Sequence, residues 1–196
     1  MCEKMRNFAP KSEKLLKMTP AEYVQLKAFA RVDGALLAVL WVVSFACYVA
    51  GMTNPLYGMV AMLLMVATPF FVALRLGKFR DVGRDGIISL ARGWAYAVYV
   101  FFYAAVLLAI AQYIYFAYID HGYLMQAFST ALSAPEAKQL MEQYGLSQSM
   151  DENLELMGQL RPIDYALNVL TANIMAGVVL GLPIAAVMRR KELKRS

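Results

Sequence analysis

Three long stretches of this chain carry no charged residue, and they limit what it can fold into more than any other feature. Residues 35–74, 94–118 and 165–188 contain no Asp, Glu, Lys, Arg or His. A helix of about twenty residues rises about 30 Å, the thickness of the hydrocarbon core of a bilayer. The first stretch is long enough for two such helices, separated by the turn signal Thr53-Asn54-Pro55. The sequence therefore predicts four membrane spans.

Composition agrees with a membrane protein. Hydrophobic residues make up 60% of the 196 positions and charged residues 17%, which leaves too little polar surface for a soluble domain of this size. We predict an all-α integral membrane protein, a four-span transmembrane helical bundle with short extramembrane helices. The expected parts are an arm with an interfacial helix (1–34), spans at about 35–52, 55–74, 94–118 and 165–188, a helical insert (119–163) and a basic tail (189–196).

The distribution of cations predicts the orientation. Seventeen of the nineteen Lys and Arg residues lie in 1–34, 75–93 and 189–196, whereas 119–164 holds only Lys138 and Arg161 beside seven acids. Cytoplasmic loops carry the excess of Lys and Arg. We therefore expect a multi-pass protein of the cell inner membrane with both termini in the cytoplasm and the insert in the periplasm.

Helix-start signals divide the extramembrane parts. Thr19-Pro20-Ala21-Glu22 is a capping box with proline at the first helical position, and Ser133 with Glu136 and Ser149 with Glu152 repeat the spacing in the insert. An apolar stripe follows in the insert, formed by Leu146, Met150, Leu154 and Met157. We interpret the insert as a helical cap on the protein's own bundle, with the bilayer or a partner as the alternative surface for this stripe.

Small residues and prolines mark the two return spans. Gly177 and Gly181 form a Gly-x-x-x-Gly pair, flanked at the same spacing by Asn173 and Ala185, which predicts close helix packing, equally within the bundle or in a dimer. Pro69 and Pro183 each lie six residues before a cytoplasmic arginine, and Pro69 should bend its helix. The two hairpins thus share a similar pattern, which an internal duplication would explain. The favoured explanation is that the pattern recurs by accident.

No catalytic constellation or metal motif stands out, and no cofactor is expected. The basic connector is a candidate site for anionic lipid head groups or a partner protein, against a solvated loop with local pairs as the favoured alternative. Its residues are Arg75, Arg80, Asp81, Arg84, Asp85 and Arg92.

Uncharged polar residues near the outer side form a second candidate, an outward-facing polar cavity. They are Asn54, Gln112, His121, Asn168, Thr171 and Asn173. Hydrogen bonds between helices are the favoured alternative. Because no ionisable residue lies within the predicted spans, ion-driven transport is disfavoured.

Several short motifs together resemble the bacterial inner-membrane family catalogued as domain of unknown function 4199, over about residues 25–190. They include Arg31-Val-Asp-Gly-Ala, Ala67-Thr-Pro-Phe-Phe71, Phe79-Arg-Asp81, Arg84-Asp-Gly-Ile-Ile-Ser89 and Leu170-Thr-Ala-Asn-Ile174. The resemblance implies four spans and brings no established activity or catalytic residue. Members of the family are often encoded near membrane-bound glycosyltransferases, which suggests work on envelope glycans.

These observations favour a non-enzymatic accessory or scaffold protein that binds a partner in the cell envelope, such as a glycan- or lipid-modifying enzyme. The alternative is a small dimeric facilitator or lipid flippase that is not coupled to ions, and an enzyme acting on lipid head groups ranks lowest. The expected partners are the lipid bilayer, another membrane protein or a second copy, and anionic head groups. Nucleic acid is not expected, because the cations flank apolar segments.

Overall fold

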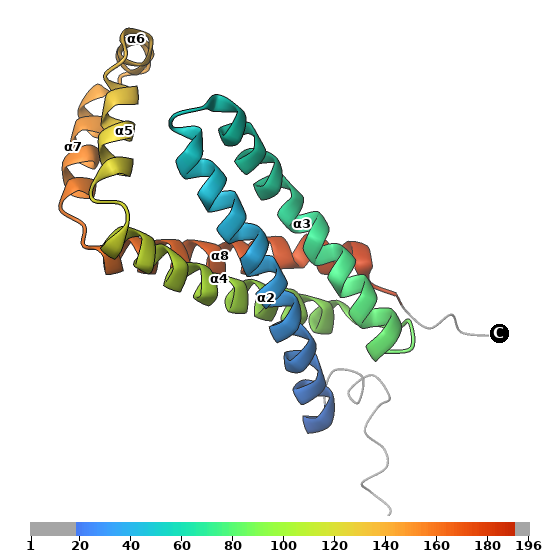
Figure 1. Ribbon diagram of the computed structural model, residues 1–196. Coiled ribbons are helices and arrows are strands. Elements are labelled where there is room, and N and C mark those ends of the chain that lie inside the picture. The colour runs from blue at the N-terminus through green and yellow to red at the C-terminus, as the bar shows by residue number, and fades with distance from the viewer. Residues whose placement is uncertain (1–18, 191–196) are drawn as a thin grey trace, which may run out of the picture.

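The computed structural model describes residues 19–190, and most of them are helical (Figure 1). The helices are α2 (Pro20–Gly51), α3 (Pro55–Gly83), α4 (Leu90–Tyr118), α5 (Tyr123–Leu132), α6 (Pro135–Gln143), α7 (Ser147–Gly158) and α8 (Pro162–Met188). The four helices α2, α3, α4 and α8 are each long and apolar enough to cross a membrane. The predicted all-α, four-span architecture is confirmed, and the protein is a multi-pass membrane protein.

The long helices begin where the sequence indicates. Thr19 caps α2 as predicted: its Oγ1 accepts a hydrogen bond from the Glu22 amide at 3.3 Å, and its own amide donates to Glu22 Oε2 at 2.9 Å. Asn54 caps α3, whose first residue is Pro55, and α8 opens on Pro162. The turn at residues 52–54 and the restart at Pro162 are therefore confirmed.

The two capping boxes expected in the insert do not form. Helix α6 begins at Pro135, so the residue in the capping position is Ala134, and Ser133 instead donates to the Ser129 carbonyl at 2.8 Å. Helix α7 begins at Ser147, which leaves Ser149 inside its first turn. Both predictions were wrong because each helix starts at a residue other than the one that the serine spacing indicates.

Helix α2 is continuous where we expected an interfacial helix followed by a span. It has 32 residues and is therefore about 48 Å long, against about 30 Å of hydrocarbon. Gly34 lies inside this helix and does not end it. Its role is to let α4 approach closely, since an added Cβ would lie 2.7 Å from Tyr103 Cβ and 2.9 Å from the Val100 carbonyl. Helix α3 likewise runs to Gly83, beyond the predicted end of its span at residue 74, so much of the basic connector is helical.

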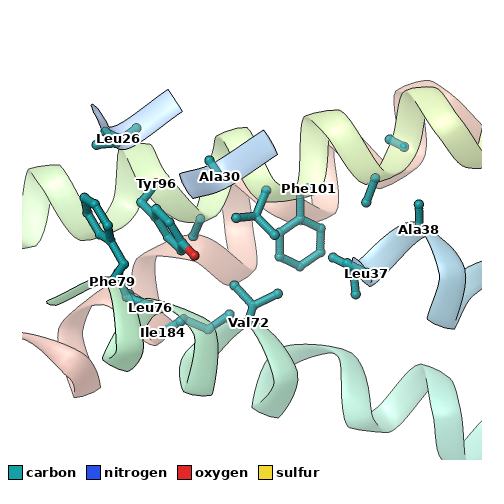
Figure 2. Close-up of a cluster of buried hydrophobic side chains, with 14 of the residues drawn as sticks. Leu26, Ala30, Leu37, Ala38, Val72, Leu76, Phe79, Tyr96, Phe101 and Ile184 are labelled. Atoms are coloured by element: carbon teal, nitrogen blue, oxygen red, sulfur yellow. The ribbon is translucent and has the colours of Figure 1, made fainter. Parts of the chain in front are cut away.

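The bundle consists of two helical hairpins that cross, α2 with α3 and α4 with α8 (Figure 1). Helix α4 packs against both α8 and α2, so it joins the hairpins. The side chains between them form one apolar core, in which the Phe79 and Tyr96 rings stack with centroids 4.8 Å apart (Figure 2). Leu37, Val72 and Phe101 fill the centre of this core.

The small-residue face of α8 packs on α4 of the same chain. Gly177 is covered by the Phe101 side chain, and an added Cβ at Gly181 would lie 3.1 Å from Trp94 Cδ1. The Trp94 indole also donates to the Val178 carbonyl at 3.0 Å. Of the two packing roles expected for this face, the structure shows the one within the bundle. Pro69 and Pro183 lie inside α3 and α8.

Helices α5, α6 and α7 form the insert, which extends beyond the end of α4 and the start of α8 (Figure 1). These three short helices contact one another. Two residues of the predicted stripe, Met150 and Leu154, line a hollow of about 340 Å³ that also involves Leu132 of α5 and Met141 of α6. The other two residues of the stripe lie elsewhere: Leu146 is exposed, and Met157 lines a second hollow, between the insert and the bundle.

Candidate functional site

A buried carboxylate is the most unusual feature of the bundle. Asp33 of α2 is 2% exposed, and its Oδ1 pairs with the Arg75 guanidinium of α3. Its Oδ2 accepts a hydrogen bond from the Tyr96 hydroxyl of α4. One carboxylate therefore ties three spanning helices together.

Asp33 is buried because of its place in the helical repeat of α2. The buried residues of this helix recur every three or four positions, as Leu26, Ala30, Asp33, Leu37, Trp41 and Ser44. Asp33 thus belongs to the face that packs into the core, and the adjacent Gly34 brings α4 close. Burying a charge is costly unless it is paired and hydrogen-bonded, and Arg75 and Tyr96 meet that requirement.

A second ion-pair layer lies about 16 Å nearer the start of α2, since Glu22 is eleven residues before Asp33. Glu22 accepts from Arg84 Nη1 at 2.7 Å and from Arg92 Nη2 at 3.2 Å. The Thr19 amide and the Arg84 guanidinium lower the pKa of Glu22 to about 2. This carboxylate joins α2 to the end of α3 and the start of α4. We call the end of the bundle that holds Glu22 and Asp33 the ion-pair end.

A third set of bonds holds the end of α8. The Arg80 guanidinium donates two hydrogen bonds to the Asp81 carboxylate, from Nε at 2.7 Å and from Nη2 at 3.0 Å. Its Nη1 also donates to the Met188 carbonyl at 3.1 Å. The Ile88 amide donates to the Arg190 carbonyl at 3.3 Å. All four long helices are therefore connected at the ion-pair end.

The basic connector differs from the solvated loop that we favoured. Arg75, Arg84 and Arg92 pair with acids of α2 that lie 42 to 70 positions away in the chain, and only Arg80 pairs with a sequence neighbour. Asp85 lies exposed in the turn after α3, with φ at +50°. The sequence did not predict the partners in α2, because we expected that region to lie apart from the connector as a separate interfacial helix.

Helix lengths place the Asp33 cluster at one boundary of the hydrocarbon. About twenty residues span it, and counting twenty from Gly51, Pro55 and Tyr118 reaches positions 32, 74 and 99. Asp33, Arg75 and Tyr96 lie at or near those positions. Asp33 and Arg75 are thus in the protein core at the ends of the predicted spans and not within them, so the expectation that ion-driven transport is disfavoured stays a prediction.

The residues expected to form an outer polar cavity lie apart. Asn54 caps α3, and His121 is exposed, with Nδ1 2.9 Å from the Ile119 carbonyl. Gln112 is buried, and its Oε1 has no hydrogen-bond partner among the described residues.

The other three residues of that set lie on α8. Thr171 and Asn173 bond to carbonyls of their own helix, at 2.9 Å each, and Asn168 is exposed. None of the six residues lines the hollow within the insert or the hollow between the insert and the bundle. The structure thus does not gather them into one site, and the favoured alternative of bonds between helices is not seen for Thr171 or Asn173.

A cavity that the sequence did not indicate lies at the opposite end from the ion pairs. It has a volume of about 630 Å³, and its walls come from α2, α4, α5, α7 and α8. Asp120, which begins the turn into α5, is buried at its edge and accepts from the amides of Gly122 and Leu124, both at 3.1 Å. We call this hollow the insert cavity.

Sequence reasoning missed Glu22, Asp33 and Tyr96 as members of a site. One signal was available: Asp33 falls in register with the apolar residues of α2, so continuing the span's repeat towards the N-terminus would have placed it on the buried face. Nothing in the sequence points to Tyr96 in particular, because nine other residues of the same span are also aromatic.

Comparison with known proteins gives one match. The profile of a family described as "Protein of unknown function (DUF4199)" matches residues 33–190. No curated protein matches the chain. No solved structure matches it either.

Proposed function

The chain belongs to the DUF4199 family of proteins of unknown function, and from its structure we propose a non-enzymatic accessory subunit that binds a partner protein in the cell envelope. The proposed location is the bacterial inner membrane, with both termini in the cytoplasm. The bundle is the anchor in this proposal, and the insert is the element that meets the partner. A glycan- or lipid-modifying enzyme is the class of partner that we propose.

The observation that carries this proposal is the apolar surface of the insert. Leu140 and Tyr144 are 55% and 69% exposed and lie four residues apart on α6 and its cap, hence on one side of that helix. Leu146 and Leu156 are also exposed, at the start of and within α7. Large apolar side chains exposed outside the membrane are typical of surfaces that another protein covers.

The ion pairs support an anchoring role. Arg75, Arg84 and Arg92 are engaged with acids of α2, which connects the helices where they would otherwise separate most easily. An anchor that keeps its shape positions the insert at a fixed place relative to the membrane surface, and preorganisation of this kind improves binding.

Affinity purification from native membranes tests the proposal. We expect the wild-type protein, extracted in mild detergent at native abundance, to carry a membrane protein in stoichiometric amount. The triple variant Leu140→Ser, Tyr144→Ser and Leu156→Ser should lose this partner, because apolar anchors dominate the energy of such interfaces. Mass spectrometry of the eluted proteins gives the measurement.

A matched control uses exposed polar residues of the same insert. The variant Gln139→Ser, Gln143→Ser and Gln159→Ser changes the same number of exposed side chains and should keep the partner. A wild-type chain that is eluted alone would contradict the proposal, as would equal loss of the partner in both variants.

The alternative of a small dimeric facilitator or flippase finds less support. The glycine face of α8, which we had considered for a dimer, is covered by α4. The polar residues expected to line a passage lie apart from one another, and Asn168 is exposed on α8. We therefore retain the accessory subunit as the one proposed function.

A further inference from the structure

The insert cavity leads to an inference that does not depend on the proposed function. We propose that this cavity binds the hydrocarbon tail of a bilayer lipid, so that the insert is attached to the membrane by a lipid as well as by its two covalent connections. The position, the lining and the hydrogen bonding of the cavity all favour this occupant.

The cavity lies at the boundary of the bilayer. Its walls include Tyr48, three residues before the end of α2, Phe116, two residues before the end of α4, and Pro162, the first residue of α8. Three spanning helices thus reach one end of their length at the cavity. Because these helices are each long enough to cross the hydrocarbon, their ends at the cavity place it near the level where the hydrocarbon ends.

The lining suits a flexible apolar chain. Met125 and Phe128 of α5 face the cavity from the insert, together with Met157 of α7, and Phe116 faces it from the bundle. Methionine adapts to irregular apolar shapes, and a volume of about 630 Å³ is within the range of small-molecule sites. Such a lining binds an extended hydrocarbon chain of variable structure.

The hydrogen bonds of the lining residues favour a lipid tail over a polar head group as the occupant. The Asp120 carboxylate already accepts bonds from Gly122 and Leu124. The Tyr165 hydroxyl donates to the Met157 carbonyl. Among the described residues, no Lys or Arg lines the cavity, so its lining presents no cation that would pair with a phosphate.

Photolabelling of the full chain tests the inference. The protein is reconstituted in vesicles of phosphatidylethanolamine and phosphatidylglycerol that contain a small fraction of phosphatidylcholine with a diazirine at the end of one acyl chain. After irradiation, peptide mapping locates the lipid adducts. We expect adducts on α5 and α7 as well as on the spanning helices, although the insert lies outside the predicted spans.

Filling the cavity should remove only the adducts on the insert. Gly158 allows this test, because an added Cβ would meet Met125 Cε at 4.0 Å without strain. In Gly158→Leu, labelling of α5 and α7 should fall about tenfold, since excluding about two methylene groups costs that much in affinity. Ser129→Leu fills the cavity from α5 and should act in the same way.

Gln159→Leu is the matched control, because it places the same leucine side chain at an exposed neighbour of Gly158 and should leave labelling unchanged. Labelling of the spanning helices shows whether each variant is folded. Absence of wild-type adducts on α5 and α7, unchanged labelling in both filled variants, an equal fall in the control, or loss of all labelling in both filled variants would each overturn the proposal.

Discussion

Removing one partner of the buried Asp33–Arg75 pair should destabilise the bundle more than removing both. In Arg75→Leu, the Asp33 carboxylate stays 2% exposed and keeps only the Tyr96 hydroxyl, which should cost about 3–5 kcal/mol. In Asp33→Leu, Arg75 can turn its guanidinium to the surface, since its side chain is already 25% exposed. The cost should then be about 2–4 kcal/mol, of which an unpaired Tyr96 hydroxyl accounts for about 1–3 kcal/mol.

The double variant shows whether the losses of stability in the two single variants come from the interaction between Asp33 and Arg75. Asp33→Leu with Arg75→Leu replaces the pair by apolar side chains, so it should lose only the cost of the unpaired Tyr96 hydroxyl, about 1–3 kcal/mol. Adding Tyr96→Phe should bring the stability within about 1 kcal/mol of the wild type. If the pair were unimportant, the effects of the two single substitutions would be small or would simply add.

Reversible unfolding in mixed micelles provides the assay. A denaturing detergent is titrated into the folded protein, and the fluorescence of Trp41 and Trp94, the two tryptophans, reports unfolding. Arg31→Leu is the control, because it removes an exposed cation two positions from Asp33 and should change the unfolding free energy by less than about 0.5 kcal/mol. A double variant as unstable as the sum of the single variants would refute the reasoning.

Three further predictions concern other contacts. Gly177→Ala should lower the unfolding free energy by about 1–3 kcal/mol, because its Cβ would press on Phe101. Combined with Phe101→Ala, it should cost less than the sum of the two single losses; additive losses would contradict this. Glu22→Gln should destabilise the folded state at neutral pH, and the difference from wild type should vanish as the pH falls from about 4.5 towards about 2. The lowered pKa of Glu22 gives stability that is present above the pKa of the unfolded state and lost below the pKa of the folded state. Thermal unfolding at several pH values measures this, and a difference that persists at pH 2 would oppose it. Thr68→Val removes the hydroxyl that accepts the hydrogen bond of the Trp41 indole at 3.0 Å and should cost about 0.6 kcal/mol of unfolding free energy. In a Trp94→Phe background, where Trp41 is the remaining tryptophan, the emission spectrum should shift; an unchanged spectrum would argue against the bond.

Much of the fold could be predicted because the bilayer restricts it. A spanning helix must be apolar for about twenty residues, so the absence of charge from residues 35–74 indicates the first hairpin directly. Asn54-Pro55 and Pro162 mark helix starts by local chemistry that does not depend on packing. The four spans and their connections could therefore be obtained from sequence.

The ion-pair end could not be predicted in the same way. Its contacts join Asp33 to Arg75 and Tyr96 across 42 and 63 positions, and pairing over such separations depends on which helix faces lie together. Tertiary packing also carried α2 through Gly34, where the local pattern suggested a boundary. The insert helices begin at Pro135 and Ser147 and therefore do not use the predicted serine caps.

In the proposed topology the insert and the ion-pair end lie on opposite sides of the membrane, with the insert outside the cytoplasm. In a chain with its two native cysteines replaced, single cysteines at Gln143 of α6 and at Lys78 of α3, both exposed, can be treated with a membrane-impermeant maleimide. We expect Gln143→Cys to react in intact spheroplasts and Lys78→Cys to react only after the membrane is opened. Labelling of Gln143→Cys only after opening, or of both positions in intact spheroplasts, would contradict the account.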